Sequence, residues 1–310
     1  MTLYDSMLAA ADPSQVEGLS RFFKTGPGQY GEGDKFLGIK VPVTRSIVKA
    51  CWKSTDFEDL ERCIGSEYHE IRLAALLVLV EIFSHAKQYA RNEAPCHFEQ
   101  CHATCHSERS EESTSHHTAC HSERSEESTS RPTPCHSERS EESLRSRCIN
   151  FYLSHTGRIN NWDLVDLSCY PLLGVWLLDK DRSILYDLAR SGKTIWEQRI
   201  GIVSTMTFIR HGQLADTFAI ADILLHHQHD LIHKAVGWLL REAGKRDRDA
   251  LEAYLQGQPG ICHSELSEES ASRYRQIPRY LQMPRTMLRY AIEKFPESER
   301  RRYLKGEMRG

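Results

Sequence analysis

Apolar residues recur along most of this chain at the spacing of an α-helix, and the alternation typical of β-strands is rare. Residues 69–85 are rich in Leu and Ala, with apolar side chains at i, i+3, i+4 and i+7. Residues 194–210 begin with Thr194 and Glu197 in the spacing of a capping box. Further amphipathic segments cover residues 214–226, 230–244 and 247–255. The pattern predicts an all-α protein.

Glycine and proline separate these segments. The breaks fall at Gly157, Pro171, Gly192, Gly212, Gly257, Pro284 and Pro296. Many short helices in antiparallel pairs predict a helical-repeat solenoid, in which stacked helices form a long, curved, concave face. An irregular all-α bundle fits the same pattern. A concave groove would explain binding, but it would not explain chemistry.

One repeated string departs from the helical pattern. CHSERSEES occurs at residues 105–113, 120–128 and 135–143, and CHSELSEES at 262–270. Repeats of a folded solenoid share only their core positions, whereas these copies are nearly identical. Because Ser, Glu and Arg offer little surface to bury, we expect disorder and a passenger role, as for a translated intergenic repeat of bacteria. The alternative is a zinc site built from the Cys-His pairs, with Cys101 near Cys105, although zinc sites usually have a second C-x(2–4)-C pair and adjacent Cys and His on a flexible chain make a poor preorganised site.

The repeat divides one expected solenoid domain into parts. These are N-terminal helical repeats at 1–95, a low-complexity and disordered insertion at 96–148, and C-terminal repeats at 149–310 with a short insertion at 262–270. Most of the 10 cysteines lie in or beside the repeat. The other three, Cys51, Cys63 and Cys169, need no special role in a reducing cytosol.

The charge of the chain is uneven. The formal net charge is −3, but the two insertions are acidic and the rest of the chain is basic. Residues 273–310 hold 11 Lys and Arg against 4 Glu. Such a surface indicates a polyanionic partner, although basic ends also serve solubility alone. The sequence has neither a long apolar run nor a secretory signal at Met1, so we expect a cytoplasmic protein without a membrane.

Trp162 and Asp166 form the first candidate site. They lie four residues apart in NNWDLVD, so in a helix they share one face, while Leu164 and Val165 can turn to the core. An indole beside a carboxylate on an exposed face suits chemistry. The alternative is a buried tryptophan with Asp166 as a cap or a solvated side chain.

A cationic stripe around Trp238 forms the second candidate site. Its members, at helical spacing, are Lys234, Trp238, Arg241 and Lys245. Cations around an aromatic ring suit phosphate contacts beside a stacking platform. The alternative is a solvated helix face with a half-buried tryptophan. Arg199, near the start of another helix, could reach a phosphate, or could form a surface ion pair with a neighbouring carboxylate.

One carboxylate, two aromatic rings and basic surroundings suit hydrolysis of an N-glycosidic bond to an alkylated purine. The alkylated base is already cationic, so it leaves without a strong general acid. Aromatic faces stabilise the cation that grows on the sugar by about 0.5–2 kcal/mol each. A carboxylate stabilises the same charge and holds the attacking water. This scheme needs no metal and no organic cofactor.

The sequence resembles the bacterial DNA alkylation repair family, the AlkD-like DNA glycosylases. The stretches that carry the resemblance are LGIKVP (37–42), HEIRLAALL (69–77), YLSHTGRINNWDLVD (152–166), WEQRIGIVSTMTFIR (196–210), DLIHKAVGWLLREAGKRD (230–247) and MPRTMLRYAIEKFPE (283–297). The resemblance implies HEAT-like repeats around duplex DNA, with a basic concave surface. It implies excision of 3-methyladenine and 7-methylguanine type bases while the base stays in the stack.

The resemblance also implies roles for single residues. The family's catalytic Asp and two cleft tryptophans match Asp166, Trp162 and Trp238. Its cleft Arg, near the lesion's backbone, matches Arg199, and Lys40 follows a loop that approaches the DNA in relatives. A repeat protein that wraps DNA needs no partner subunit, so we expect a monomer. The alternatives are a non-catalytic DNA-binding protein and a protein-interaction solenoid.

Overall fold

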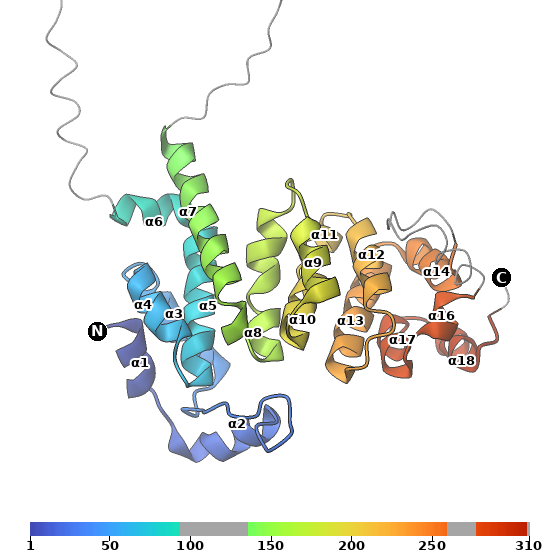
Figure 1. The fold of residues 1–310 in the computed structure, drawn as a ribbon, viewed down its shortest axis with the longest axis horizontal. Helices are drawn as coiled ribbons and strands as arrows, with labels where there is room; N and C mark the ends of the chain where they lie inside the picture. The colour runs from blue at the N-terminus through green and yellow to red at the C-terminus, as the bar shows by residue number, and fades with distance from the viewer. Residues whose placement is uncertain (94–135, 259–276, 309–310) are drawn as a thin grey trace, which may run out of the picture.

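The helices pack side by side in a row that follows the order of the sequence (Figure 1). The computed structural model describes residues 1–93, 136–258 and 277–308. Over these ranges the protein is all-helical and has no β-strand, which confirms the predicted fold class. Neighbouring helices pair in the manner of a helical-repeat solenoid, as α9 does with α10 and α12 with α13.

The helices before the long insertion are α1 (Leu3–Ala9), α2 (Val16–Phe22), α3 (Val41–Cys51), α4 (Phe57–Ile64), α5 (His69–Ser84) and α6 (Ala86–Glu93). Those that follow it are α7 (His136–Ser154), α8 (Trp162–Asp166), α9 (Ser183–Ser191), α10 (Ile195–Val203), α11 (Met206–Arg210), α12 (Ala215–Ile223), α13 (Asp230–Arg246) and α14 (Arg248–Gln256). The row ends with α16 (Arg279–Gln282), α17 (Arg285–Ala291) and α18 (Glu297–Lys305).

Helix α5 is the most deeply buried helix of the N-terminal half. Its Leu- and Ala-rich sequence is apolar on almost every side, and it packs against α3, α4 and α7. The predicted helix at 69–85 is therefore confirmed. The first turn is different, because His69, Glu70 and Arg72 are charged or polar and still buried. Buried groups of this kind need hydrogen-bonding partners, and each of the three has them.

The predicted segment 194–210 forms two helices, α10 and α11. The Thr194 hydroxyl accepts from the Glu197 backbone N–H at 3.2 Å, as the capping-box spacing predicts. The chain then bends between the helices, where the hydroxyls of Ser204 and Thr205 donate to the carbonyls of Ile200 and Ile202 at 2.7 Å each. Such side-chain bonds compete with the helix ladder, and the apolar pattern alone does not register them.

The long insertion is shorter than predicted at its C-terminal end. Residues 96–135 and 262–270 lie outside the described residues, but residues 136–148 form the start of α7. The boundary at 148 was wrong because Leu144 and Cys148 are buried, in helical register with Ile149 and Tyr152. The last CHSERSEES copy thus runs into a helix whose second half packs on α5.

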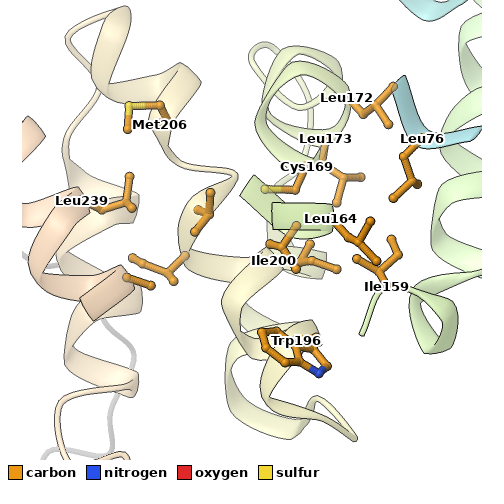
Figure 2. Close-up of a cluster of buried hydrophobic side chains, with 14 of the residues drawn as sticks. Leu76, Ile159, Leu164, Cys169, Leu172, Leu173, Trp196, Ile200, Met206 and Leu239 are labelled. Carbon is orange, nitrogen blue, oxygen red and sulfur yellow. The ribbon is translucent and has the colours of Figure 1, made fainter. Parts of the chain in front are cut away.

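Helix α8 is held against α10 by apolar side chains (Figure 2). Leu164 of α8 and Ile200 of α10 lie next to each other, with Cys169 nearby, and all three are fully buried. Val165 is also buried, so both residues predicted to face the core do so. This packing leaves the other side of α8 for Trp162 and Asp166.

The loop that leads into α3 is fixed by a buried carboxylate. Glu70 accepts the backbone N–H groups of Leu37, Gly38 and Ile39 at 3.0, 2.9 and 3.1 Å. These three hydrogen bonds give partners to the buried carboxylate oxygens and to the backbone N–H groups of a turn that has no helical hydrogen bonds. Lys40, which follows, is exposed and forms the N-cap position of α3.

Gly38 allows this loop to pass close to the chain before η1 (Pro13–Gln15). Its φ is +87°, and an added Cβ would lie 1.9 Å from the carbonyl oxygen of Asp12. We expect Gly38→Ala to lower the free energy of unfolding by more than about 3 kcal/mol in urea denaturation. Gly33→Ala is the matched control, because its φ is +85° with no atom within 4 Å, and we expect a loss of about 1–2 kcal/mol. Equal losses would contradict the steric argument.

Candidate functional site

The first turns of α8, α10 and α13 meet around Tyr30, which lies in the loop after α2. The Tyr30 hydroxyl lies near the side chain of Trp162, the first residue of α8. Its ring contacts Trp196 of α10 edge-on, with centroids 5.9 Å apart. Burial raises the pKa of Tyr30, while Trp162 and the charges of Lys234 and Arg199 oppose the rise. The three helices thus share one polar and aromatic site.

A buried ion pair joins α8 to α10 within this site. Arg199 Nε donates to Asp166 Oδ1 at 2.8 Å, and Arg199 Nη2 donates to Asp166 Oδ2 at 2.7 Å. The remaining Nη1 donates to the Leu231 carbonyl of α13 at 2.7 Å. One guanidinium therefore ties all three helices together. Burial raises the pKa of Asp166, and Arg199 opposes the rise by favouring the carboxylate.

Arg199 lies deeper than the sequence indicated. Only 5% of the residue is exposed, and each guanidinium nitrogen has an acceptor. A contact from the surface to a phosphate and a surface ion pair were the two interpretations, and neither matches this burial. The sequence could not give the depth, because the partner Asp166 is 33 residues away. The predicted DNA contact by Arg199 stays a prediction.

Trp162 has an aromatic neighbourhood that the sequence did not indicate. Its ring stacks on Phe23 at 5.7 Å and contacts Phe22 edge-on at 5.9 Å. The Asn161 side chain accepts from the Trp162 backbone N–H at 2.9 Å and starts the helix. Trp162 and Asp166 do share one short helix, as predicted, with Trp162 half-buried. Asp166 is neither a cap nor a solvated side chain, so the alternative interpretation is wrong.

Sequence reasoning missed Tyr30 and the loop that carries it. A cavity of about 430 Å³ lies beside this tyrosine. Its lining residues are Lys24, Gly28, Gln29, Tyr30 and His229. The glycines around Tyr30 were the only available signal, since Gly28 and Gly33 have positive φ and mark a turning loop. Neither periodicity nor a motif identifies the side chain that such a loop delivers.

The stripe on α13 lies on one half-exposed face, but carboxylates neutralise it. Lys234 pairs with Asp230 at 2.7 Å, and Lys245 pairs with Glu242 at 2.8 Å. Arg241 contacts Glu242 at 3.2 Å and also Glu293, which follows α17. Trp238 lies among these cations and is half-buried. The stripe thus keeps features of both interpretations, a solvated face and a set of cations around an aromatic ring.

Lys40 differs from the cations of this stripe. It is exposed, and in the described ranges no carboxylate forms an ion pair with it. Its backbone position is set by Glu70 through the preceding three residues, so its placement does not depend on its own side chain. It stays a predicted DNA contact.

A second buried network lies behind Trp162. His69 Nε2 is 2.9 Å from Asp163 Oδ2, and His69 Nδ1 is 3.2 Å from Asp34 Oδ2. Arg72 donates to Asp34 at 2.6 Å and to Asn160 at 3.0 Å. Although burial alone lowers the pKa of His69, Asp163 and Asp34 raise it to about 9. His69 is therefore an imidazolium at neutral pH.

This raised pKa predicts that the protein loses stability at alkaline pH. The contribution of His69 is complete below the unfolded pKa of 6.5 and is lost as the pH rises through about 9. We expect a loss on the order of 3 kcal/mol in the free energy of unfolding, measured by urea denaturation from pH 6 to pH 10. His69→Gln should lack this part of the pH dependence. An identical pH dependence in variant and wild type would refute the assignment.

The described ranges, 1–93, 136–258 and 277–308, also bear on metals and membranes. There, no three His, Cys, Asp or Glu side chains gather as a metal site. No helix in the described part is long and apolar enough to cross a membrane.

The chain is similar to a known protein family over most of its length. A family model described as DNA alkylation repair enzyme matches residues 4–106 and 133–295. The matched ranges hold Tyr30, α8, α10 and α13. No curated protein matches the sequence.

Proposed function

Since the chain belongs to the DNA alkylation repair enzyme family, we propose that it is a DNA N-glycosylase. Its substrates are cationic alkylated purines of the 3-methyladenine and 7-methylguanine type in duplex DNA, and its product is an abasic site. The observation that carries the proposal is the carboxylate of Asp166, held by a bidentate Arg199 in a site with Trp162 and Tyr30.

In this proposal Asp166 acts on the sugar. The bond between C1′ and the alkylated nitrogen breaks, and its electron pair neutralises the cationic base. Positive charge develops on the deoxyribose, and the carboxylate stabilises it and orients the water that attacks C1′ and then releases a proton to the solvent. Arg199 supports this role in two ways, because its two donors favour the anion and fix the direction of both oxygens.

Trp162 and Trp238 are proposed to place their aromatic faces against the same growing charge. Each such contact stabilises a cation by about 0.5–2 kcal/mol. The Tyr30 hydroxyl, which lies near Trp162, supports the orientation of that ring. These residues favour the transition state and need no proton donor to the base.

DNA is the partner that the family implies, and we propose the contacts that hold it. Lys234, Arg241 and Lys245 exchange their carboxylate partners for phosphates, while Lys40 adds a cation that pairs with no carboxylate among the described residues. Exchange of this kind releases counterions, so affinity should fall as salt rises. We further propose that the helices on both sides of the long insertion form one monomeric solenoid domain, which works in the cytoplasm without a cofactor.

A duplex with a single 7-methylguanine tests the proposal. The wild type in excess should convert the lesion to an abasic site, scored by strand cleavage in alkali, faster than the protein-free duplex does. The alternative, a non-catalytic DNA-binding protein, predicts binding without abasic sites. In that case Lys234→Ala or Arg241→Ala would lower only the affinity and its salt dependence.

A further inference from the structure

His69 lies at the centre of an aromatic stack that ends at Trp162. Its ring lies 4.7 Å from the ring of Phe23 and 4.9 Å from that of Phe36, and Phe23 in turn stacks on Trp162 at 5.7 Å. The exposed fraction of His69 is 1%. A displacement of this imidazole would therefore be transmitted through Phe23 to the tryptophan.

A hydrogen bond connects His69 to the same helix by a second path. Asp163, next to Trp162 in α8, is 3% exposed, and its Oδ2 is held by His69 Nε2 at 2.9 Å. Its Oδ1 is buried without a hydrogen-bond partner in the described structure. Loss of His69 would leave a buried carboxylate with no hydrogen bond, which is costly enough to displace the turn that carries it.

The charges around His69 hold it in place from several elements. Asp34 of the N-terminal loop contacts Nδ1, and Asp163 of α8 contacts Nε2. Arg72 of α5 pairs with Asp34 at 2.6 Å. Besides burial, the charge of Arg158, which lies before α8, lowers the pKa of Arg72. Asp34 and Asp163 thus face Arg72 and His69, and the charges of these four buried groups cancel only when the imidazole is protonated.

We propose that His69 is a positioning residue for the reaction, fixing Trp162 and the turn of α8 that leads to Asp166. The inference rests on the proposed glycosylase function. The exposed fraction of His69 is too small for direct contact with DNA, so its effect passes through Asp163 and Phe23.

The test compares His69→Gln with the matched control His155→Gln. His155 bonds the exposed Glu61 at 2.9 Å, and its ring contacts that of Phe151 at 4.4 Å in a tilted arrangement. With the 7-methylguanine duplex in excess protein, His69→Gln should lower the single-turnover rate on the order of tenfold or more. Its DNA dissociation constant should stay within about twofold. An unchanged rate, or equal losses in rate and affinity, would overturn the proposal.

The pH profile separates positioning from general stability. In the wild type the rate should fall as the pH passes about 9, after subtraction of the protein-free reaction. Asp163→Asn removes one of the two carboxylates that raise the pKa of His69, so this fall should move to lower pH. A fall at the same pH in both proteins would overturn the proposal, even if His69→Gln does not fold.

A spectroscopic readout keeps the inference independent of activity. The full chain is labelled with 5-fluorotryptophan, and the Trp162 resonance is assigned by its loss in Trp162→Phe. His69→Gln should shift or broaden this resonance and leave unchanged that of Trp52, which caps the end of α3 and packs on His85. If the wild type releases no base but the resonance shifts, the proposed function fails and the positioning of Trp162 stands. An unshifted resonance contradicts the positioning itself.

Discussion

Replacing Arg199 by methionine is expected to lower the free energy of unfolding by about 3–5 kcal/mol at neutral pH. Methionine keeps much of the apolar stem but removes all three donors. Asp166, with 15% of its side chain exposed, would then be a buried anion without its cation. The Leu231 carbonyl would lose its bond to the same guanidinium. The effect is large because removing one partner leaves the desolvation of the other uncompensated.

The pH dependence of this loss identifies its cause. Without Arg199 the pKa of Asp166 should rise further, because burial is no longer opposed. A carboxyl group whose pKa is higher in the folded than in the unfolded state stabilises the protein at low pH. This stabilisation is lost as the pH rises through the folded-state pKa. The gap between wild type and Arg199→Met should therefore narrow as the pH falls from 7.5 to 4.5.

Urea denaturation of Arg199→Met and Arg21→Met gives the comparison. Arg21 pairs with Glu17 at 2.8 Å, but the two side chains are 79% and 88% exposed, so its replacement should cost under about 1 kcal/mol. If both variants lose the same stability, the buried pair does not hold α8, α10 and α13 together as described.

Asp166→Asn is expected to lower the single-turnover rate of base release by about 100-fold to 1000-fold. The amide removes the negative charge opposite the growing sugar cation and leaves Arg199 as a buried, uncompensated cation. Binding of the duplex should persist, because the carboxylate acts on the charge that forms during the reaction.

The matched control for this variant is Asp216→Asn. Asp216 also pairs with an arginine, Arg182, at 2.5 Å and has the same 15% side-chain exposure, but it lies on α12, outside the Tyr30 site. Both changes remove one carboxylate from one partly buried pair. If Asp216→Asn slows release as much as Asp166→Asn does, the loss reflects stability and not chemistry.

The fold was largely predictable because local patterns decide it. The run of Leu and Ala predicts helix α5 directly. The Thr194 cap lies only three residues from its partner, Glu197. The predictions were wrong where a few buried residues determine the structure of a segment whose average composition indicates disorder. The polar first part of α7 is helical because Leu144 and Cys148 are buried in the same helix. The polar composition of the CHSERSEES copy gives no sign of this burial.

The candidate site was predictable only in part, for the same reason. Trp162 and Asp166 share a face because they are four residues apart on one helix. Glu293 pairs with Arg241 although the two are 52 residues apart in the sequence. His69 contacts Asp163 across 94 residues. Such pairs form only when the solenoid brings distant helices together, so no spacing in the sequence reveals them.

The most direct test of the proposed activity is the identification of the released base. Duplex DNA with one 7-methylguanine is incubated with an excess of wild type or Asp166→Asn, and the free base is quantified by chromatography and mass spectrometry. Release by the wild type, well above the protein-free rate and lost in Asp166→Asn despite binding, is the result we expect. Bound duplex with no free 7-methylguanine from the wild type would contradict the glycosylase function.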